Sequence, residues 1–341
     1  MIVAIHPDDY GPGDASSPRW AELLRRSGFE IRWVNVREAN ILDQLRGCSG
    51  LMWRHAHFGE MAQIASRLMP VVEREMGICV YPDRSTAWHY DDKIAQAMLF
   101  EVLGIPTPRT WVWFDRDASL EWMSSSAPMP LVAKLATGAG SENVCLVPER
   151  QFGAELIEAL FGPGLPSLDE VSLGLLARLS RAYRTFRRTA RYRQVHHGYA
   201  LFQEFLPGND FDTRVTVIGC RAFVFRRLNR PGDFRASGSG RIDYSRDAVD
   251  SKMIRLAFAT SAKLESQSCA IDGLWRGGEP VVGEVSYTYV SKAVYECPGH
   301  WALSGTPDAG ELKWVDGNMW PEDAQIEDFI ARLSRGSPMY K

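Results

Sequence analysis

Short apolar runs alternate with amphipathic stretches along the first 85 residues, and this pattern predicts strands separated by helices. Strands are expected at 2–6, 29–36, 50–53 and 77–81. A helix is expected to open at Ser16-Ser17-Pro18, where a capping serine precedes proline in the first turn, and to end before Gly28. A second helix is expected over 60–76. Strands that alternate with helices are typical of a small parallel sheet, so 1–85 is predicted to form an N-terminal α/β domain.

Strands become more frequent than helices in the remainder of the chain. A helix is predicted over 89–103, where Gly104 and two following prolines stop it. Further helices are expected at 250–265 and, as a peripheral element, at 321–333, and strands are expected at 109–114, 131–135, 144–147, 201–206, 211–218, 221–227, 270–275 and 281–285. We expect a central α+β unit over 86–206, with a basic helical insertion at about 162–198, and a C-terminal α+β unit with a tail over 207–341.

The composition excludes several classes of protein. With 45% hydrophobic and 24% charged residues, the chain can bury an ordinary core. Its 39 Lys and Arg nearly balance 42 Asp and Glu, so no net charge attracts nucleic acid or anionic lipid. No apolar run approaches the roughly 20 residues of a membrane span, and the six cysteines are isolated, as in a reducing compartment. We therefore expect a cytoplasmic protein that binds neither membrane nor nucleic acid, with a homodimer as the commonest default.

The segment from Pro130 to Val144 joins a lysine to a glycine-rich turn. A predicted strand ends at Lys134, and Gly138, Gly140 and Ser141 follow. Glycines let backbone N–H groups approach phosphate oxygens closely, and a lysine adds a positive charge. The segment is neither a Walker A motif nor a dinucleotide fingerprint. Taken alone, it fits a phosphate-binding loop and the tip of a hairpin equally well.

Three further segments combine charge with predicted strands. Glu204 lies at an apolar strand edge, which can face adenine through backbone groups and a ribose through its carboxylate. Asp212 and Arg214 lie two residues apart and project from one strand face, where a structural salt bridge between them is the simpler interpretation. Asp272 and Glu284 lie on neighbouring predicted strands and supply the hard oxygen ligands that Mg²⁺ prefers.

In this order, the segments resemble the ATP-grasp superfamily, and within it the glutathione-synthetase-like group that contains the ribosomal-protein S6 glutamate ligases. The resemblance covers about 85–290 and runs through Asp92-Lys93, Gly104–Pro108, Lys134, Gly138–Ser141, Gln203–Phe205, Asp212–Arg214, Asp233–Arg235, Asp272 and Glu284. It implies an ATP-grasp fold, in which a parallel N-terminal α/β domain precedes two α+β subdomains that clasp ATP.

The resemblance also implies roles for individual residues. Phosphates of ATP would be held by Lys93 and Lys134 and covered by Gly138, Gly140 and Ser141, while the remaining nucleotide contacts would come from Gln203, Glu204, Phe205, Leu206 and Asp210. Arg214 and Arg235, with Lys134, would steady the transferred phosphoryl group. Asp272 and Glu284 would hold Mg²⁺, or Mn²⁺ in its place. Ser286 stands where the family usually has Asn, and a hydroxyl is a poorer ligand for the metal than an amide carbonyl.

The activity that this resemblance implies is ATP-dependent ligation of a carboxylate to an amine through an acyl phosphate, with release of ADP and phosphate. The carboxylate would belong to a small molecule or a peptide. Loops at 6–14, 54–58 and 287–301 and the basic insertion are expected to choose the substrates. Three alternatives stay open: an ATP-grasp kinase, a non-catalytic ATP-binding module, which Ser286 makes worth testing, and an arginine-mediated scaffold for an acidic partner.

Three further patterns bear on the chemistry. The insertion carries Arg178, Arg181, Arg184, Arg187, Arg188, Arg191 and Arg193, whose spacing places several on one helical face. Such a face is either solvated or a site for an acidic ligand or partner. Cys297 and His300 would form a nucleophile pair, although no orienting acid is evident, and their loop fits the wall of an acceptor site better. His55 and His57 are too few to indicate zinc.

Overall fold

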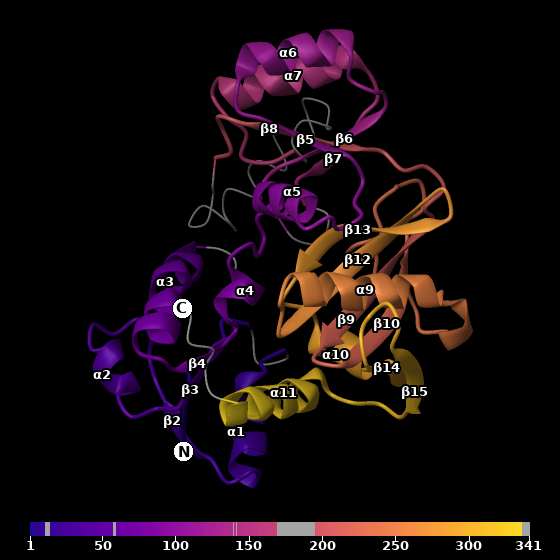
Figure 1. The fold of residues 1–341 in the computed structure, drawn as a ribbon. Coiled ribbons are helices and arrows are strands. Elements are labelled where there is room, and N and C mark those ends of the chain that lie inside the picture. The colour runs from indigo at the N-terminus through magenta and orange to yellow at the C-terminus, as the bar shows by residue number, and fades with distance from the viewer. Residues whose placement is uncertain (11–13, 57–58, 139, 141, 169–194, 336–341) are drawn as a thin grey trace.

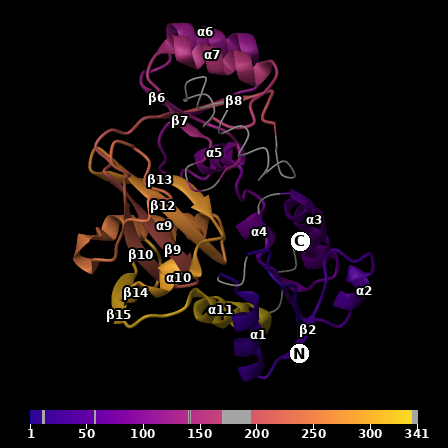
Figure 2. The ribbon, with the colours of Figure 1, turned by 180° about the vertical axis from the view of Figure 1, so that it is seen from behind.

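The computed structural model describes residues 1–10, 14–56, 59–138, 140, 142–168 and 195–335. The arginines at 178–193 therefore lie outside the described residues, as do Ser141 and His57. Figures 1 and 2 show three sheets: one near the N-terminus, one beneath the paired helices α6 and α7, and a larger one that carries α9. No helix in the described ranges is long and apolar enough to cross a membrane.

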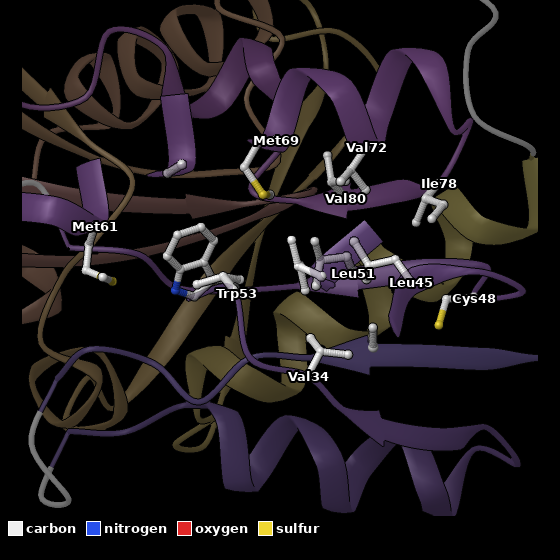
Figure 3. Packing of buried hydrophobic residues seen from close by; sticks show 14 of the residues in the cluster. Val34, Leu45, Cys48, Leu51, Trp53, Met61, Met69, Val72, Ile78 and Val80 are labelled. Atoms are coloured by element: carbon white, nitrogen blue, oxygen red, sulfur yellow. The ribbon is translucent and has the colours of Figure 1, made fainter. Parts of the chain in front are cut away.

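The N-terminal sheet is parallel, as the alternation of strands and helices predicts. Its strand order is β2-β1-β3-β4, formed by β1 (Ile2–Ile5), β2 (Glu30–Trp33), β3 (Gly50–Met52) and β4 (Cys79–Tyr81). Alternate residues of these strands face opposite layers of helices. Leu51 and Trp53 pack on the side of α2 (Ile41–Leu45), α3 (Gly59–Pro70) and the π-helical turn η1 (Val71–Glu75), which Figure 3 shows from close by.

The opposite face of this sheet is covered by two helices from the two ends of the chain. These are α1 (Ser17–Arg26) and α11 (Pro321–Arg335), which lie side by side in Figures 1 and 2. Ile326 and Phe329 of α11 are buried against Val3, Ile5 and Met52 of the sheet. The expectation of a peripheral C-terminal helix is therefore wrong, because its apolar face completes the N-terminal core.

The central sheet is antiparallel, with the strand order β5-β8-β6-β7. It consists of β5 (Thr110–Trp113), β6 (Leu131–Lys134), β7 (Val144–Val147) and β8 (Ala200–Glu204). Two helices that the sequence pattern did not indicate, α6 (Arg116–Ser125) and α7 (Arg150–Phe161), bury one face of this sheet. The other face carries Lys134 and Gln203, which line cavities.

The C-terminal sheet is a larger antiparallel layer. Its main path is β13-β12-β9-β10-β14-β15, and β11 pairs with β10. The strands are β9 (Phe211–Ile218), β10 (Arg221–Leu228), β11 (Ile242–Asp243), β12 (Ser268–Arg276), β13 (Glu279–Ser286), β14 (Gly299–Ser304) and β15 (Glu311–Asp316). One face is covered by α9 (Ser251–Lys263), whose Met253, Ala257 and Phe258 are buried in the same core as Val215 and Ile271.

The two antiparallel sheets are joined by α5 (Lys93–Val102), which contacts both β5 and β13 and lies between the two layers in Figures 1 and 2. The expected helix at 89–103 instead begins at Lys93, after the short α4 (Arg84–Ala87). Asp92 is the reason, because its carboxylate accepts hydrogen bonds from the N–H groups of Ile94 at 3.1 Å and Ala95 at 2.9 Å. Such a capping residue fixes where a helix starts, and here it places Lys93 in the first turn.

Candidate active site

A row of side chains crosses the face of the C-terminal sheet that α9 leaves uncovered. Glu284 on β13 is opposite Asp272 on β12, Asp272 is opposite Arg214 on β9, and Arg214 is opposite Phe225 on β10. Directly opposite residues of antiparallel strands project from the same face. The strand register therefore brings together two carboxylates and a guanidinium that are separated by up to 70 positions in the sequence.

Two arginines hold Asp272 in this row. Arg214 donates from Nε and Nη2 to the two carboxylate oxygens of Asp272, both at 2.8 Å, and Arg227 Nη2 lies 2.7 Å from Asp272 Oδ2. Burial alone would raise the pKa of Asp272, but the two guanidinium groups hold it well below its ordinary value. Asp272 is therefore a carboxylate at any physiological pH.

Asp212 does not pair with Arg214, as the simpler interpretation of their spacing had it. Both oxygens of Asp212 instead accept hydrogen bonds from Arg227 on β10, at 2.7 and 2.5 Å. The reason is the strand register, which places Arg227 directly opposite Asp212. Arg227 was missed in the sequence because nothing in its neighbourhood marks it, and only the pairing of β9 with β10 reveals it.

A second cluster surrounds the start of α5. Lys93 Nζ donates to the carbonyl oxygen of Gly138 at 2.8 Å and lies 3.4 Å from Glu284 Oε1 and 3.7 Å from Asp91 Oδ1. Asp91 Oδ1 also accepts from the N–H of Gly138 at 2.9 Å. Burial lowers the pKa of Lys93, but Glu284 and Asp91 outweigh it and raise the pKa above the ordinary value. Gly138 is thus held from both sides by residues at the start of α5.

Lys134 ends β6 and faces the same region from the central sheet. Burial lowers its pKa to about 8, with Lys93 acting in the same direction and Glu284 against it. Within the described residues, its ammonium group makes no hydrogen bond or ion pair. A partly buried cation without a partner is costly in a folded protein, and an anionic ligand would satisfy it.

Between the two antiparallel sheets lies a cleft of about 540 Å³, which we call the first cleft. Its lining includes all four residues of 203–206 and also Asp210, Lys134 and Arg235. Apolar walls come from Val132, Val144, Phe205, Leu206, Phe234 and Leu274. Flat apolar walls with a few charged groups at one end suit an aromatic base attached to phosphates. Glu204 is already engaged by the backbone N–H of Arg109 at 3.1 Å.

A second cleft, of about 490 Å³, lies on the other side of the carboxylate pair. Arg214, Arg227, Ser286 and Gly140 line it. Residues of three loops expected to choose substrates also line it, namely Tyr10, Asp14, Arg54, Thr288, Tyr289, Val290, Ala293 and Val294. Asp272, Glu284 and Ser237 belong to both clefts. The two acids therefore stand where the first and second clefts meet.

Two glycine-rich loops come together above this junction. Gly238 approaches Gly140 so closely that an added Cβ would lie 3.2 Å from the carbonyl oxygen of Gly140. Its φ of +73° also favours glycine. Arg235, in the same loop, donates to the carbonyl oxygen of Val144 at 3.2 Å and pairs with Asp233 at 2.8 Å. The loop at 232–240 thus links the C-terminal sheet to the central sheet.

The two acids, Asp272 and Glu284, offer the kind of ligand that Mg²⁺ prefers. Asp272 and Glu284 provide two carboxylates on adjacent strands, and Ser286 lies two residues farther along β13. The Ser286 hydroxyl donates to the carbonyl oxygen of Thr288 at 2.9 Å. Within the described residues there is no group of three His, Cys, Asp or Glu that could hold a metal. Two carboxylates suit Mg²⁺, which takes its remaining ligands from phosphates and water.

Cys297 and His300 do not form a catalytic pair. The Cys297 thiol contacts the carbonyl oxygens of Val224 and Ala293, and burial raises its pKa to about 12. The His300 ring packs on Phe223 with a centroid distance of 5.2 Å. Both residues are buried, so the nucleophile interpretation has no support. His55 is buried against Tyr287, with ring centroids 5.1 Å apart, and neither residue lines the second cleft.

The paired antiparallel sheets with a nucleotide-sized cleft between them define the class: the chain has the ATP-grasp fold. Solved structures similar to it include a RimK-domain ATP-grasp protein from Sphaerobacter thermophilus DSM 20745, which is 16% identical over 98% of this chain and 100% of that one, with a TM-score of 0.51. D-cycloserine synthetase DcsG is 14% identical over 98% and 100% of the chains, with a TM-score of 0.58.

The ATP-grasp ligase PsnB, solved with its precursor peptide PsnA2 and AMPPNP, is 16% identical over 98% of both chains, with a TM-score of 0.56. No protein-family model and no curated protein matches the sequence. The likeness therefore lies in the fold. The evidence for a particular reaction comes from the sequence motifs and the two clefts.

Proposed function

We propose that this chain is an ATP- and Mg²⁺-dependent carboxylate–amine ligase. The observation that carries the proposal is the meeting of two clefts at one pair of acids, Asp272 and Glu284. One cleft has apolar walls for a base and cations at its inner end, and the other opens toward the N-terminal domain. Such an arrangement suits transfer of a phosphoryl group from a nucleotide in the first cleft to a substrate in the second.

In the proposed reaction, an oxygen of the substrate carboxylate attacks the γ-phosphorus of ATP, and ADP leaves. The amine nitrogen then attacks the acyl carbon and loses a proton, and phosphate leaves with the bonding electrons and takes up that proton as hydrogen phosphate. Lys93 and Lys134 would bind the phosphates, while Arg214 and Arg235 would neutralise charge on the transferred group from either side of the junction. Mg²⁺ held by Asp272 and Glu284 would supply further charge neutralisation. The loops at Gly138–Gly140 and Gly232–Gly240 would exclude water from the acyl phosphate.

A hydroxylamine-trapping assay tests the proposal. The protein is incubated with MgATP, hydroxylamine and pools of carboxylic acids, and nucleotides and hydroxamates are read by mass spectrometry. We expect ADP together with a hydroxamate, because hydroxylamine replaces the amine in attack on the acyl phosphate. ADP with a phosphorylated product and no hydroxamate would instead identify a kinase. ATP binding without ADP from any pool would identify a non-catalytic nucleotide-binding module.

The role of Lys134 is tested by Lys134→Ala, which should abolish ADP formation while the circular-dichroism spectrum stays unchanged. The matched control is Lys252→Ala, because Lys252 lies on α9 and pairs at the surface with Glu279 at 2.7 Å. Loss of a surface ion pair has little effect on stability or function. Full turnover in Lys134→Ala would contradict the assignment of Lys134 to phosphate binding.

A further inference from the structure

The second cleft changes character along its length. Its inner end is charged, with Glu284, Asp272 and Arg214 in one row. The row continues into Phe225, directly opposite Arg214 on β10. In the neighbouring row, Arg227 is directly opposite Ile242 of β11. An apolar region therefore begins where the guanidinium groups end, on the same face of the sheet.

A short helix completes this apolar region from the facing side. Residues Val290, Ala293 and Val294, in and just before α10 (Ser291–Tyr295), line the cleft together with Phe225 and Ile242. We call these five residues the apolar end. Ile242 is 38% exposed and Val290 is 55% exposed, although both are large hydrophobic residues. Phe225 and Val294 are already buried in one cluster, so an apolar group in the cleft would gain contact chiefly by covering Ile242, Val290 and the half-buried Ala293.

The charged groups that line the outer part of the cleft are already paired. Arg54 donates to Asp14 Oδ2 at 2.9 Å and to the carbonyl oxygen of Tyr289 at 2.8 Å, and its guanidinium lies 4.1 Å from the centre of the Tyr10 ring. Among the residues that the structure describes, the outer part therefore offers no unpaired cation to a second carboxylate on a substrate, which would also meet the partly exposed Asp14. The outer cleft disfavours a dicarboxylic substrate.

We infer that the acid substrate of this chain is a carboxylic acid with an apolar body, such as an aliphatic or aromatic acid, rather than an acidic amino acid. Its carboxylate lies by Arg214 and Arg227, next to the junction of the clefts. Both arginines pair with aspartates, but within the described residues Arg214 Nη1 makes no hydrogen bond, whereas both terminal nitrogens of Arg54 are engaged. The carbon chain of the acid occupies the apolar end. The inference rests on the proposed ligase activity, since it names the substrate class of that site. It follows from the order of charged and apolar residues along two rows of one sheet.

Two measurements test the inference, one by turnover and one by binding. The hydroxylamine assay is run separately with hexanoate, phenylacetate, leucine and phenylalanine and with succinate, aspartate and glutamate. Binding of the same acids is measured by calorimetry on protein saturated with AMPPNP and Mg²⁺, which requires no turnover. We expect hydroxamates and heat from members of the apolar set only.

The outcomes separate the inference from the function on which it rests. Hydroxamates from the dicarboxylic acids alone would overturn the inference and leave the ligase standing. Binding of apolar acids with no ADP formed would uphold the substrate class and count against the ligase. Absence of both binding and hydroxamate from every apolar acid would overturn the inference.

A variant of the apolar end provides an internal check. Val290→Asp should raise KM for apolar acids by about ten-fold or more, because the carbon chain would have to displace water from the new carboxylate. The Kd for AMPPNP should stay unchanged, since Val290 does not line the first cleft. Val102→Asp is the matched control, because Val102 is 84% exposed on α5 and lines neither cleft. Equal KM values in the two variants would contradict the placement of the apolar body.

Discussion

Lys134 combines a cost in stability with a proposed role in binding. Folding lowers its pKa from 10.5 to about 8, which corresponds to at most about 3 kcal/mol of destabilisation at neutral pH. We expect Lys134→Met, which keeps the volume and removes the charge, to unfold at higher urea concentration than the wild type at pH 7. The same variant should bind AMPPNP at least about ten-fold more weakly, since it removes a charged partner of the phosphates.

The pH dependence of this effect has a definite sign. Between about pH 8 and 10.5 the unfolded chain keeps the proton that the folded chain has lost, so the wild type becomes more stable as pH rises. The advantage of Lys134→Met should therefore be largest below pH 8 and shrink toward pH 10. Urea unfolding at pH 7 and pH 10 measures it, and a constant advantage would contradict a shifted pKa for Lys134.

Asp91 has a different task, which is to hold Gly138. Its carboxylate accepts the N–H of Gly138, and it keeps a φ of +51°, a conformation that asparagine also tolerates. Asp91→Ala should raise KM for ATP by about ten-fold, because the loop loses a charge-assisted hydrogen bond. Asp91→Asn retains an acceptor and should recover most of the loss. An unchanged KM in Asp91→Ala would show that the loop is positioned without this contact.

Residues in local motifs could be located from the sequence, and residues that depend on strand register could not. Lys134 ends a strand, and Asp272 and Glu284 each lie beside a glycine. Their order along the sequence indicated one site, and the structure brings the three residues together. Arg227 becomes visible only when β10 is paired with β9. Asp91 carries no signal beyond its place before Asp92-Lys93, because its function depends on a loop 47 positions away.

At the scale of elements, strands of the sheets were easier to predict than the helices that cover them. β7 and β9 have the predicted bounds, since turn residues flank each of them. α6 and α7 were missed, although Asp115 caps α6 by accepting from the N–H of Ala118 at 2.8 Å. β14 and β15 were also missed, because their pairing places several polar residues in an exposed part of the sheet.

The contact between the two glycine loops gives a prediction at this scale. Gly238→Ala would place a Cβ 2.9 Å from Arg230 Nη2, which can move aside, and 3.2 Å from the carbonyl oxygen of Gly140. Gly232 has nearly the same φ, +74°, and no atom within 4 Å of an added Cβ. Both alanine variants should lose about 1 kcal/mol of stability from left-handed strain. Only Gly238→Ala should also reduce ADP formation, by several-fold. Equal turnover in the two variants would show that loop contact is unnecessary for activity.

At the scale of the whole molecule, the C-terminal helix ties the N-terminal sheet to the second cleft. Gln325 of α11 accepts from Trp20 Nε1 of α1 at 2.8 Å and donates to the hydroxyl of Tyr289 at 2.8 Å. Glu322 accepts from the hydroxyls of Ser16 at 2.8 Å and Ser291 at 2.6 Å. One helix thus orients α1, α10 and a wall of the cleft, a link that no local pattern in the sequence could show.

This link predicts that damage to α11 will destabilise the other end of the chain. Phe329 is 1% exposed and packs between α1 and the N-terminal sheet, so Phe329→Ala should lower the free energy of unfolding by about 3–5 kcal/mol. Phe114→Ala is the control, because Phe114 is 59% exposed and should change stability by less than about 0.5 kcal/mol. In Phe329→Ala, backbone hydrogen exchange should accelerate more in β1 and β3 than in β6 and β7, although β1 and β3 lie far from residue 329 in the sequence. Faster exchange confined to α11 would contradict this coupling, because the N-terminal sheet would then keep its core without the helix.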